Sequence, residues 1–175
     1  MTAEALVNAI VALLASGGST NHTIHLIAIA RAAGYLINWD DFDIISKATP
    51  SLCKIYPNGE ADINQFHLAG GTHKLFLELQ KLGLLHLDTK TCTGRRFGES
   101  FAHPILSDGE LQWSTEPSEN SDEGVLARAA SPFHAEGGIQ LLTGNIGRSV
   151  IKVSAVSNEN KCVRAEAIVL SDPSE

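Results

Sequence analysis

The stretch SGGSTNHT, from Ser16 to Thr23, places two glycines and several hydroxyl, amide and imidazole side chains just before an apolar helical pattern. Glycines leave backbone N–H groups open, and a helix start concentrates such donors together with a positive potential. Carboxylate and phosphate groups bind at sites of this kind. Gly17–His22 is therefore a candidate anion site, in which Ser19, Thr20 and Asn21 add side-chain donors. The alternative is an ordinary helix N-cap preceded by a glycine-eased turn.

A second polar stretch, YPNGEADINQFHLAGGTHK, covers Tyr56–Lys74. Asn64 and His67 are three residues apart and share one face if the segment is helical. His67 is a candidate for positioning a substrate or transferring a proton. The alternative is a turn, a helix cap and a packed histidine. The pair His67 and His73 has no carboxylate at a metal-binding offset, so no metal site is predicted here.

The other reactive residue types form weaker patterns. The sequence has no GxSxG, P-loop or GxGxxG motif. Cys53, Cys92 and Cys162 are far apart and form no CxxC pair, which favours three reduced cysteines in a cytoplasmic protein. Arg148 and Lys152 alternate with apolar residues and are expected to be solvated.

The composition is that of a globular protein. The chain has 175 residues, of which 43% are hydrophobic and 19% charged, enough for one domain or two small ones. A formal net charge of −7 without a Lys/Arg cluster argues against nucleic-acid binding. The longest apolar run, Ala9–Ala15, is too short to span a membrane. No basic segment precedes it, so no signal peptide is predicted.

The first 94 residues predict a series of helices separated by glycine, proline and capping residues. Thr2 is a suitable N-cap for the first helix, which has one apolar stripe. The second helix carries apolar residues around most of its circumference and is expected to be buried on most sides. The expected helices cover Ala3–Ala15, Thr23–Ala33, a segment from Asn38 to Pro50, a short segment from Asp62 to Gly70, and Thr72–Leu82.

The pattern changes after Gly94. Residues 95–138 are rich in Pro, Ser and Glu and predict a linker or excursion with one short strand near Leu111–Ser114. Residues 139–175 predict β-structure, with a hairpin turn at Ser157–Lys161. Its strands are expected at Ile139–Leu142, Ser149–Val156 and Cys162–Leu170. Each half has buried-looking elements with too few partners, which indicates a piece of a larger fold.

Several of these stretches carry a family resemblance. The segments ASGGSTNHTIHLIAIARAAG, LGLLHLDT and SPFHAEGGIQLLTGNIGRSVIKVSAV resemble the dihydroxy-acid and sugar-acid dehydratase family. Within that family, NWDDF and the pattern YPNG-AD-N-FH-AGG are similar to the phosphogluconate branch. The likeness extends from about Ala5 to Leu170.

The resemblance implies a fold and a reaction. The fold class is α/β, with the helix-rich end of an α/β cluster-bearing domain (1–94) followed by the start of a β-barrel-like domain (139–175). The reaction removes water from a 2,3-dihydroxy acid and yields a 2-keto acid; here 6-phosphogluconate would give 2-keto-3-deoxy-6-phosphogluconate, in the Entner–Doudoroff pathway. An iron–sulfur cluster, expected as 4Fe–4S, would draw off the C3 hydroxyl as a Lewis acid. The full-length protein would be a cytoplasmic homodimer.

The resemblance also places key groups outside this chain. The cluster cysteines of the family precede the matched part, and the catalytic serine region follows it. The chain is therefore expected to be an internal segment that is inactive alone and holds no catalytic residue or metal ligand, with an additional Mg²⁺ left open. Substrate contact is expected from Ser19, Thr20 and Asn21, and substrate orientation from His22 and His67.

Two other functions stay open. A dehydratase of the same family acting on another sugar acid or dihydroxy acid would have the same motifs. A non-catalytic binding or assembly module, dimerising through its apolar helices, would also explain the exposed apolar surface that the sequence predicts.

Overall fold

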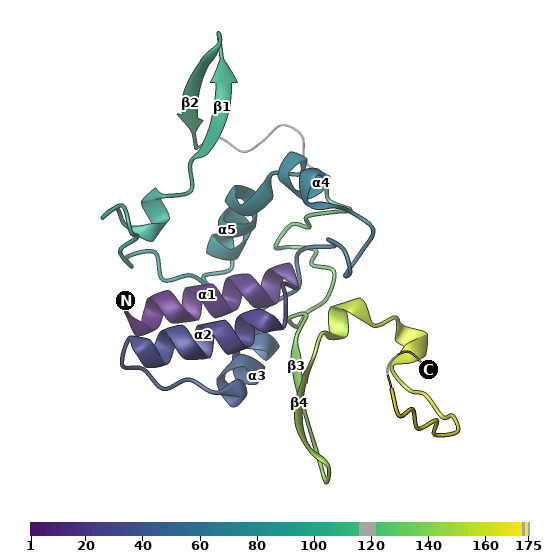
Figure 1. Ribbon diagram of the computed structural model, residues 1–175. Helices are drawn as coiled ribbons and strands as arrows, with labels where there is room; N and C mark the ends of the chain where they lie inside the picture. Colours follow the sequence, from purple (N-terminus) through teal and green to yellow (C-terminus); the bar gives the residue numbers. More distant parts are fainter. Residues whose placement is uncertain (116–121, 173, 175) are drawn as a thin grey trace.

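The computed structural model describes residues 1–115, 122–172 and 174. It combines α-helices with small antiparallel sheets, so the mixed α/β class is confirmed (Figure 1). The helices are α1 (Ala3–Ser16), α2 (Asn21–Ala32), α3 (Trp39–Ala48), α4 (Ile63–Leu68) and α5 (Gly71–Lys81). The strands are β1 (His103–Ser107), β2 (Glu110–Ser114), β3 (Gln140–Gly144) and β4 (Gly147–Ile151). None of the described helices is long and apolar enough to cross a membrane.

Helix α1 is the centre of the packing. The Thr2 hydroxyl accepts a hydrogen bond from the Ala5 amide at 3.3 Å, which confirms the predicted cap. Gly17 ends the helix in a left-handed conformation with φ of 60°, and its amide bonds back to the last turn. The predicted apolar stripe is buried, and α1 contributes residues to two core clusters, one toward α4 and α5 and the other toward α3 and β3.

Helix α2 lies alongside α1 (Figure 1), but the prediction that it is buried on most sides is wrong. Only Thr23 and Ala30 are buried, and Ile24 is 61% exposed. The physical reason is a shortage of neighbours, because α1 covers one side of α2 and no described element covers the opposite side. An all-round apolar pattern predicts burial only where partners exist.

The starts of α3 and α4 confirm the capping analysis. Asn38 accepts from the Asp40 amide at 2.7 Å, and its own amide donates to the Asp41 carboxylate at 2.8 Å. Asp62 and Gln65 exchange the same kind of reciprocal bonds at the start of α4. The two helices therefore begin where the sequence predicts.

The described sheets are two antiparallel hairpins, β1–β2 and β3–β4, and they agree only in part with the predicted strands. The expected strand at 111–114 is β2, and its partner β1 lies in the segment expected as a linker. The expected strand Ser149–Val156 ends at Ile151, after which a 3₁₀ turn covers Val153–Ala155.

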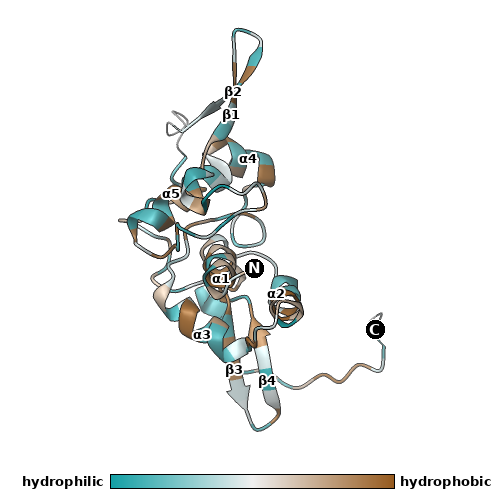
Figure 2. Cartoon of the chain, turned by 90° about the vertical axis from the view of Figure 1, so that its left-hand side faces the viewer, coloured by the Kyte–Doolittle hydropathy of each residue, from teal (hydrophilic) through white to brown (hydrophobic). Residues whose placement is uncertain are grey.

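The C-terminal part differs most from the prediction. Ser157–Lys161 contains a 3₁₀ turn, Asn158–Asn160, instead of a hairpin turn. The expected strand Cys162–Leu170 is not a strand, and Figure 2 shows this segment running away from the helices. A strand needs a neighbour for its hydrogen-bonding groups, and no described segment supplies one. A β-barrel-like second domain and the division at residues 94 and 138 stay predictions.

The segment after the undescribed residues 116–121 returns to the first half. The Lys54 amide donates to the Val125 carbonyl at 2.9 Å, and the Ala127 amide donates to the Leu52 carbonyl at 2.9 Å. Leu126 is fully buried between them. These bonds fix the 51–58 loop, which forms part of the cavity described next.

Candidate functional site

The loop Gly17–Thr20, between α1 and α2, borders a cavity of about 870 Å³. The cavity collects residues from distant parts of the sequence and is lined mainly by apolar side chains. Its polar members come from the loop itself, from Asn58, from the start of α5 and from Lys152, which follows β4. An apolar cavity with a few convergent polar groups is the usual form of a small-molecule site.

The structure brings together only part of the set predicted from sequence. Ser19, Thr20 and His22 line this cavity, whereas Asn21 and His67 do not. His67 lines a different cavity, of about 470 Å³. The roles assigned to all five residues stay predictions, because position alone shows no contact with a ligand.

The loop leaves donors available at the entrance of α2. Thr20 is the N-cap residue, yet its side chain makes no capping bond. The amides of His22 and Thr23 donate to the Ser19 and Thr20 carbonyls at 3.0 and 3.1 Å. Within the described chain, no acceptor is found for the Ser19 and Thr20 amides. The Ser19 hydroxyl accepts from the Asn21 amide at 3.2 Å, so Ser19 rather than Thr20 provides the side-chain bond at this helix start. The Ser19 and Thr20 amides remain as two backbone donors for a ligand.

Asn58 holds this loop in place. Its Nδ2 donates to the Gly17 carbonyl at 2.8 Å, and its Oδ1 accepts from the Ser154 hydroxyl at 2.8 Å. The Ser154 amide in turn donates to the Gly138 carbonyl at 3.3 Å. A Cβ atom at Gly17 would overlap the Asn58 amide, so this close approach requires glycine. One amide side chain therefore joins the loop to the segment that carries Lys152.

Lys152 differs from the sequence expectation. It is half-buried rather than fully solvated, and desolvation lowers the pKa of its ammonium group. No carboxylate partner is found for it among the described residues. By contrast, Arg148 is paired with Asp40. An unpaired, partly desolvated cation beside open backbone donors is suited to bind an anion.

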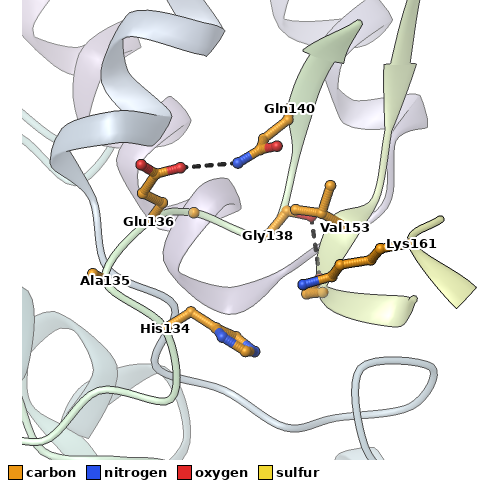
Figure 3. Close-up of a pocket in the computed structure, with 9 residues that line it drawn as sticks. His134, Ala135, Glu136, Gly138, Gln140, Val153 and Lys161 are labelled. Carbon is orange, nitrogen blue, oxygen red and sulfur yellow. Dashed lines mark hydrogen bonds between the residues drawn. The ribbon is translucent and has the colours of Figure 1, made fainter. Parts of the chain in front are cut away.

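A smaller cavity of about 340 Å³ lies on the other side of the Ser154 contact (Figure 3). Its wall includes Glu136, which accepts from the Gln140 side chain at 2.9 Å, and Lys161. His134 lies at its edge. The Glu136 carboxylate makes this smaller cavity a poorer anion site than the cavity at Gly17–Thr20.

The described cysteines do not fit an iron–sulfur cluster. Burial raises the pKa of Cys53 to about 12, which opposes the thiolate form that binds metals. Cys92 and Cys162 are exposed. In the part of the chain that the structure describes, no three His, Cys, Asp or Glu residues lie close enough to hold a metal ion.

Sequence reasoning missed a pair of histidines. His73 of α5 and His103 of β1 lie with ring centroids 4.5 Å apart, in the same cavity as His67. His73 stood in a polar stretch that the sequence analysis singled out. The position of His103 depends on a hairpin whose first strand had no clear sequence signal, so the pair was not predictable.

Comparison with known proteins gives two family matches. Residues 1–100 match the family described as "Dihydroxy-acid/6-phosphogluconate dehydratase N-terminal", and residues 124–175 match its C-terminal counterpart. The chain is 49% identical over 166 residues to "Phosphogluconate dehydratase" of Escherichia coli strain K12, which covers 95% of this chain and 28% of that protein.

Two other relatives agree. The Pseudomonas aeruginosa "Phosphogluconate dehydratase" is 48% identical over 169 residues, covering 97% of this chain and 28% of that protein. The "Dihydroxy-acid dehydratase" of Caldanaerobacter subterraneus is 42% identical over 161 residues, covering 91% of this chain and 26% of that protein. The chain spans little more than a quarter of the length of these relatives. With both family matches in place, the chain belongs to the dihydroxy-acid/6-phosphogluconate dehydratase family.

Proposed function

We propose that this chain forms the anion-binding wall of the substrate site in a hydro-lyase that dehydrates 6-phosphogluconate to 2-keto-3-deoxy-6-phosphogluconate. One observation carries the proposal. A single cavity is lined by the Gly17–Thr20 loop, which lies in the N-terminal family match, and by Lys152, which lies in the C-terminal match. The names of the relatives, "Phosphogluconate dehydratase" above all, favour the substrate.

The substrate chemistry requires such a wall. A phosphorylated sugar acid carries a carboxylate at one end and a phosphate at the other, so its binding needs donors and cations at separate points. The Ser19 and Thr20 amides can bind one of these anionic groups, and the Lys152 ammonium can bind the other. The apolar remainder of the cavity lowers the local dielectric constant, which strengthens these interactions. Asn58 fixes the position of the Gly17–Thr20 loop relative to the segment that carries Lys152.

The remaining parts of the reaction are proposed to come from outside this chain. Because the described cysteines do not fit an iron–sulfur cluster, the cluster ligands, any Mg²⁺ ligands and the base that takes the C2 proton are assigned to other parts of the protein. The chain alone is therefore expected to bind substrate without turning it over. A homodimeric, cytoplasmic full-length protein belongs to the same proposal.

A second candidate is supported by the "Dihydroxy-acid dehydratase" relative at 42% identity. A dihydroxy acid without phosphate would need one anion contact rather than two. The two candidates therefore differ in what Lys152 does, since an unpaired cation has its clearest use with a doubly charged substrate. A non-catalytic assembly module is supported only by the exposed side of α2.

The experiment is a titration of the isotope-labelled chain with 6-phosphogluconate, gluconate and inorganic phosphate, followed by amide NMR. We expect 6-phosphogluconate to bind most tightly and to shift the Ser19 and Thr20 amides. Lys152→Met should weaken its binding about tenfold to a hundredfold, the range for losing one charge-assisted hydrogen bond. Lys90→Met, which removes an exposed lysine outside this cavity, is the matched control.

Three outcomes would contradict the proposal. Equal affinity for gluconate and 6-phosphogluconate would show that the phosphate group does not contribute to binding, and would favour the second candidate. Amide chemical-shift changes confined to residues away from the cavity would show that the substrate does not bind there. Formation of 2-keto acid by the chain alone would show that the catalytic groups lie within it.

A further inference from the structure

The paired histidines form a site that the proposed function does not use. His73 lies in the first half of α5, and His103 is the first residue of β1. Their rings are inclined at 45° with centroids 4.5 Å apart. Both line the cavity of about 470 Å³ between α5 and the base of the β1–β2 hairpin. The two histidines therefore come from distant segments of the chain, which also meet where Phe76 stacks on Phe101.

The nitrogens of this pair lack partners. His73 is only 7% exposed, and neither of its ring nitrogens has a hydrogen-bond partner. The buried Nδ1 of His103 has none either. Buried polar atoms nearly always have a partner, so three unpartnered nitrogens in one place indicate a ligand that is not protein.

The environment of His73 favours the form of imidazole that binds metals. Burial lowers the pKa of His73, and the neighbouring His103 lowers it further. A neutral imidazole presents a lone pair, which is the form in which histidine coordinates a metal. The His103 ring lies beside it and offers a second imidazole as a ligand.

The spacing fits coordination of one ion. Two imidazoles bound at adjacent positions of one metal, with metal–nitrogen bonds of about 2.0–2.1 Å, have ring centroids roughly 4.4–5.1 Å apart. The observed 4.5 Å lies in this interval. The exposed His67 lines the same cavity. Since no third protein ligand is close enough among the described residues, water would fill the remaining positions.

We propose that His73 and His103 bind one divalent first-row transition metal ion of the imidazole-preferring type, such as Ni²⁺, Cu²⁺ or Zn²⁺. The ion would join the β1–β2 hairpin to α5. Two protein ligands and water make an exchangeable site, and its affinity should follow the order Mn²⁺ < Co²⁺ < Ni²⁺ < Cu²⁺. The two histidines do not line the proposed substrate cavity, although Thr72 and Phe76 line both cavities. The metal proposal does not depend on the dehydratase proposal.

The test uses the untagged chain with Cys92 and Cys162 changed to serine, so that exposed thiols do not bind the probe. Isothermal titration with Ni²⁺ and Mn²⁺ is expected to show one Ni²⁺ per chain and much weaker Mn²⁺ binding. His73→Gln and His103→Gln should each weaken Ni²⁺ binding about tenfold or more. His86→Gln, on a histidine outside this cavity, should leave it unchanged.

A spectroscopic measurement covers the case in which His73→Gln does not fold. The electron paramagnetic resonance spectrum of bound Cu²⁺ should show coupling to two imidazole nitrogens in the parent chain and to one in His103→Gln. Unchanged Ni²⁺ affinity in folded His73→Gln and His103→Gln would overturn the proposal. So would Cu²⁺ coupling that is the same in the parent chain and in His103→Gln.

Discussion

Helices α1 and α2 are consecutive, apolar and joined by a short loop, yet they occupy different environments. In α1, the leucine and isoleucine stripe is buried, and Leu14 has no exposed surface. In α2, Ile24 is 61% exposed and Ile29 is 43% exposed. α1 has neighbours on several sides, namely α2, α3 and α5, whereas α2 packs mainly on α1.

Apolar content and burial are therefore separate properties of a helix. Apolar residues on a helix predict that it will be covered somewhere, and the number of neighbours decides how much of it is covered in a given chain. Substitutions and a pH titration can test this contrast between α1 and α2.

The largest effect is expected from truncating the buried stripe. Leu14→Ala should lower the free energy of unfolding by about 3–5 kcal/mol, because it leaves a cavity in a fully covered position. Ile24→Ala on α2 is the matched control and should cost far less. Chemical denaturation of both variants measures the difference. Equal losses would show that α2 is covered as well as α1 is.

The next effect concerns the loop that joins the two helices. Asn58→Ala should cost about 1–3 kcal/mol, because it removes the bonds to Gly17 and Ser154 in a partly buried place. It should also weaken 6-phosphogluconate binding, since the loop and Lys152 lose their connection. Gln65→Ala, which loses only an exposed cap bond, is the control. An unchanged affinity of Asn58→Ala for 6-phosphogluconate would show that the connection between the loop and Lys152 does not affect substrate binding.

The third effect is a pH dependence from α5, which also packs on α1. Since the folded pKa of His73 lies below its ordinary value, the unfolded chain binds more protons than the folded one in the interval between the two. Stability should be full above about pH 6.5 and fall as the pH drops through the lowered folded value. Thermal unfolding between pH 7.5 and 5 measures this loss.

In His73→Gln, the loss between pH 6.5 and 5 should be smaller than in the parent chain. In His25→Gln, on the exposed side of α2, it should be unchanged. A parent chain whose melting temperature is constant over this interval would show that His73 is not held in its neutral form.

The smallest effect on stability is expected on α2. Ile24→Gln should change the free energy of unfolding by no more than about 0.5 kcal/mol, because the side chain is mostly in water already. It should reduce self-association, measured by sedimentation velocity, because it removes exposed apolar surface. Strong destabilisation would show that a second copy of the chain covers this side.

The sequence predicted the local elements better than their surroundings. Thr2, Asn38 and Asp62 each begin a helix because capping depends on residues within one turn. The pattern at Cys162–Leu170 predicted a strand that the structure does not contain, since strand formation depends on a neighbour.

The candidate site follows the same rule. Ser19 and Thr20 were identified because glycine, hydroxyl groups and a helix start are adjacent in sequence. Lys152 was assigned to solvent, because its place beside the loop depends on the Asn58–Ser154 contact between distant segments. Site residues that come together only through tertiary contacts cannot be read from a local pattern.

The last turn of α1 also has a consequence for folding. The Leu14 carbonyl accepts from the Gly138 amide at 3.1 Å, and the Ala15 carbonyl accepts from the Leu52 amide at 2.8 Å. The Gly17 amide also donates to the Leu14 carbonyl at 3.4 Å, so this end of α1 combines a local bond with bonds to residues far along the chain. The two distant bonds close the long loops that end at Leu52 and at Gly138. During synthesis, the bond to Gly138 forms only after that residue has emerged, and the exchange rate of the Gly138 amide reports its formation.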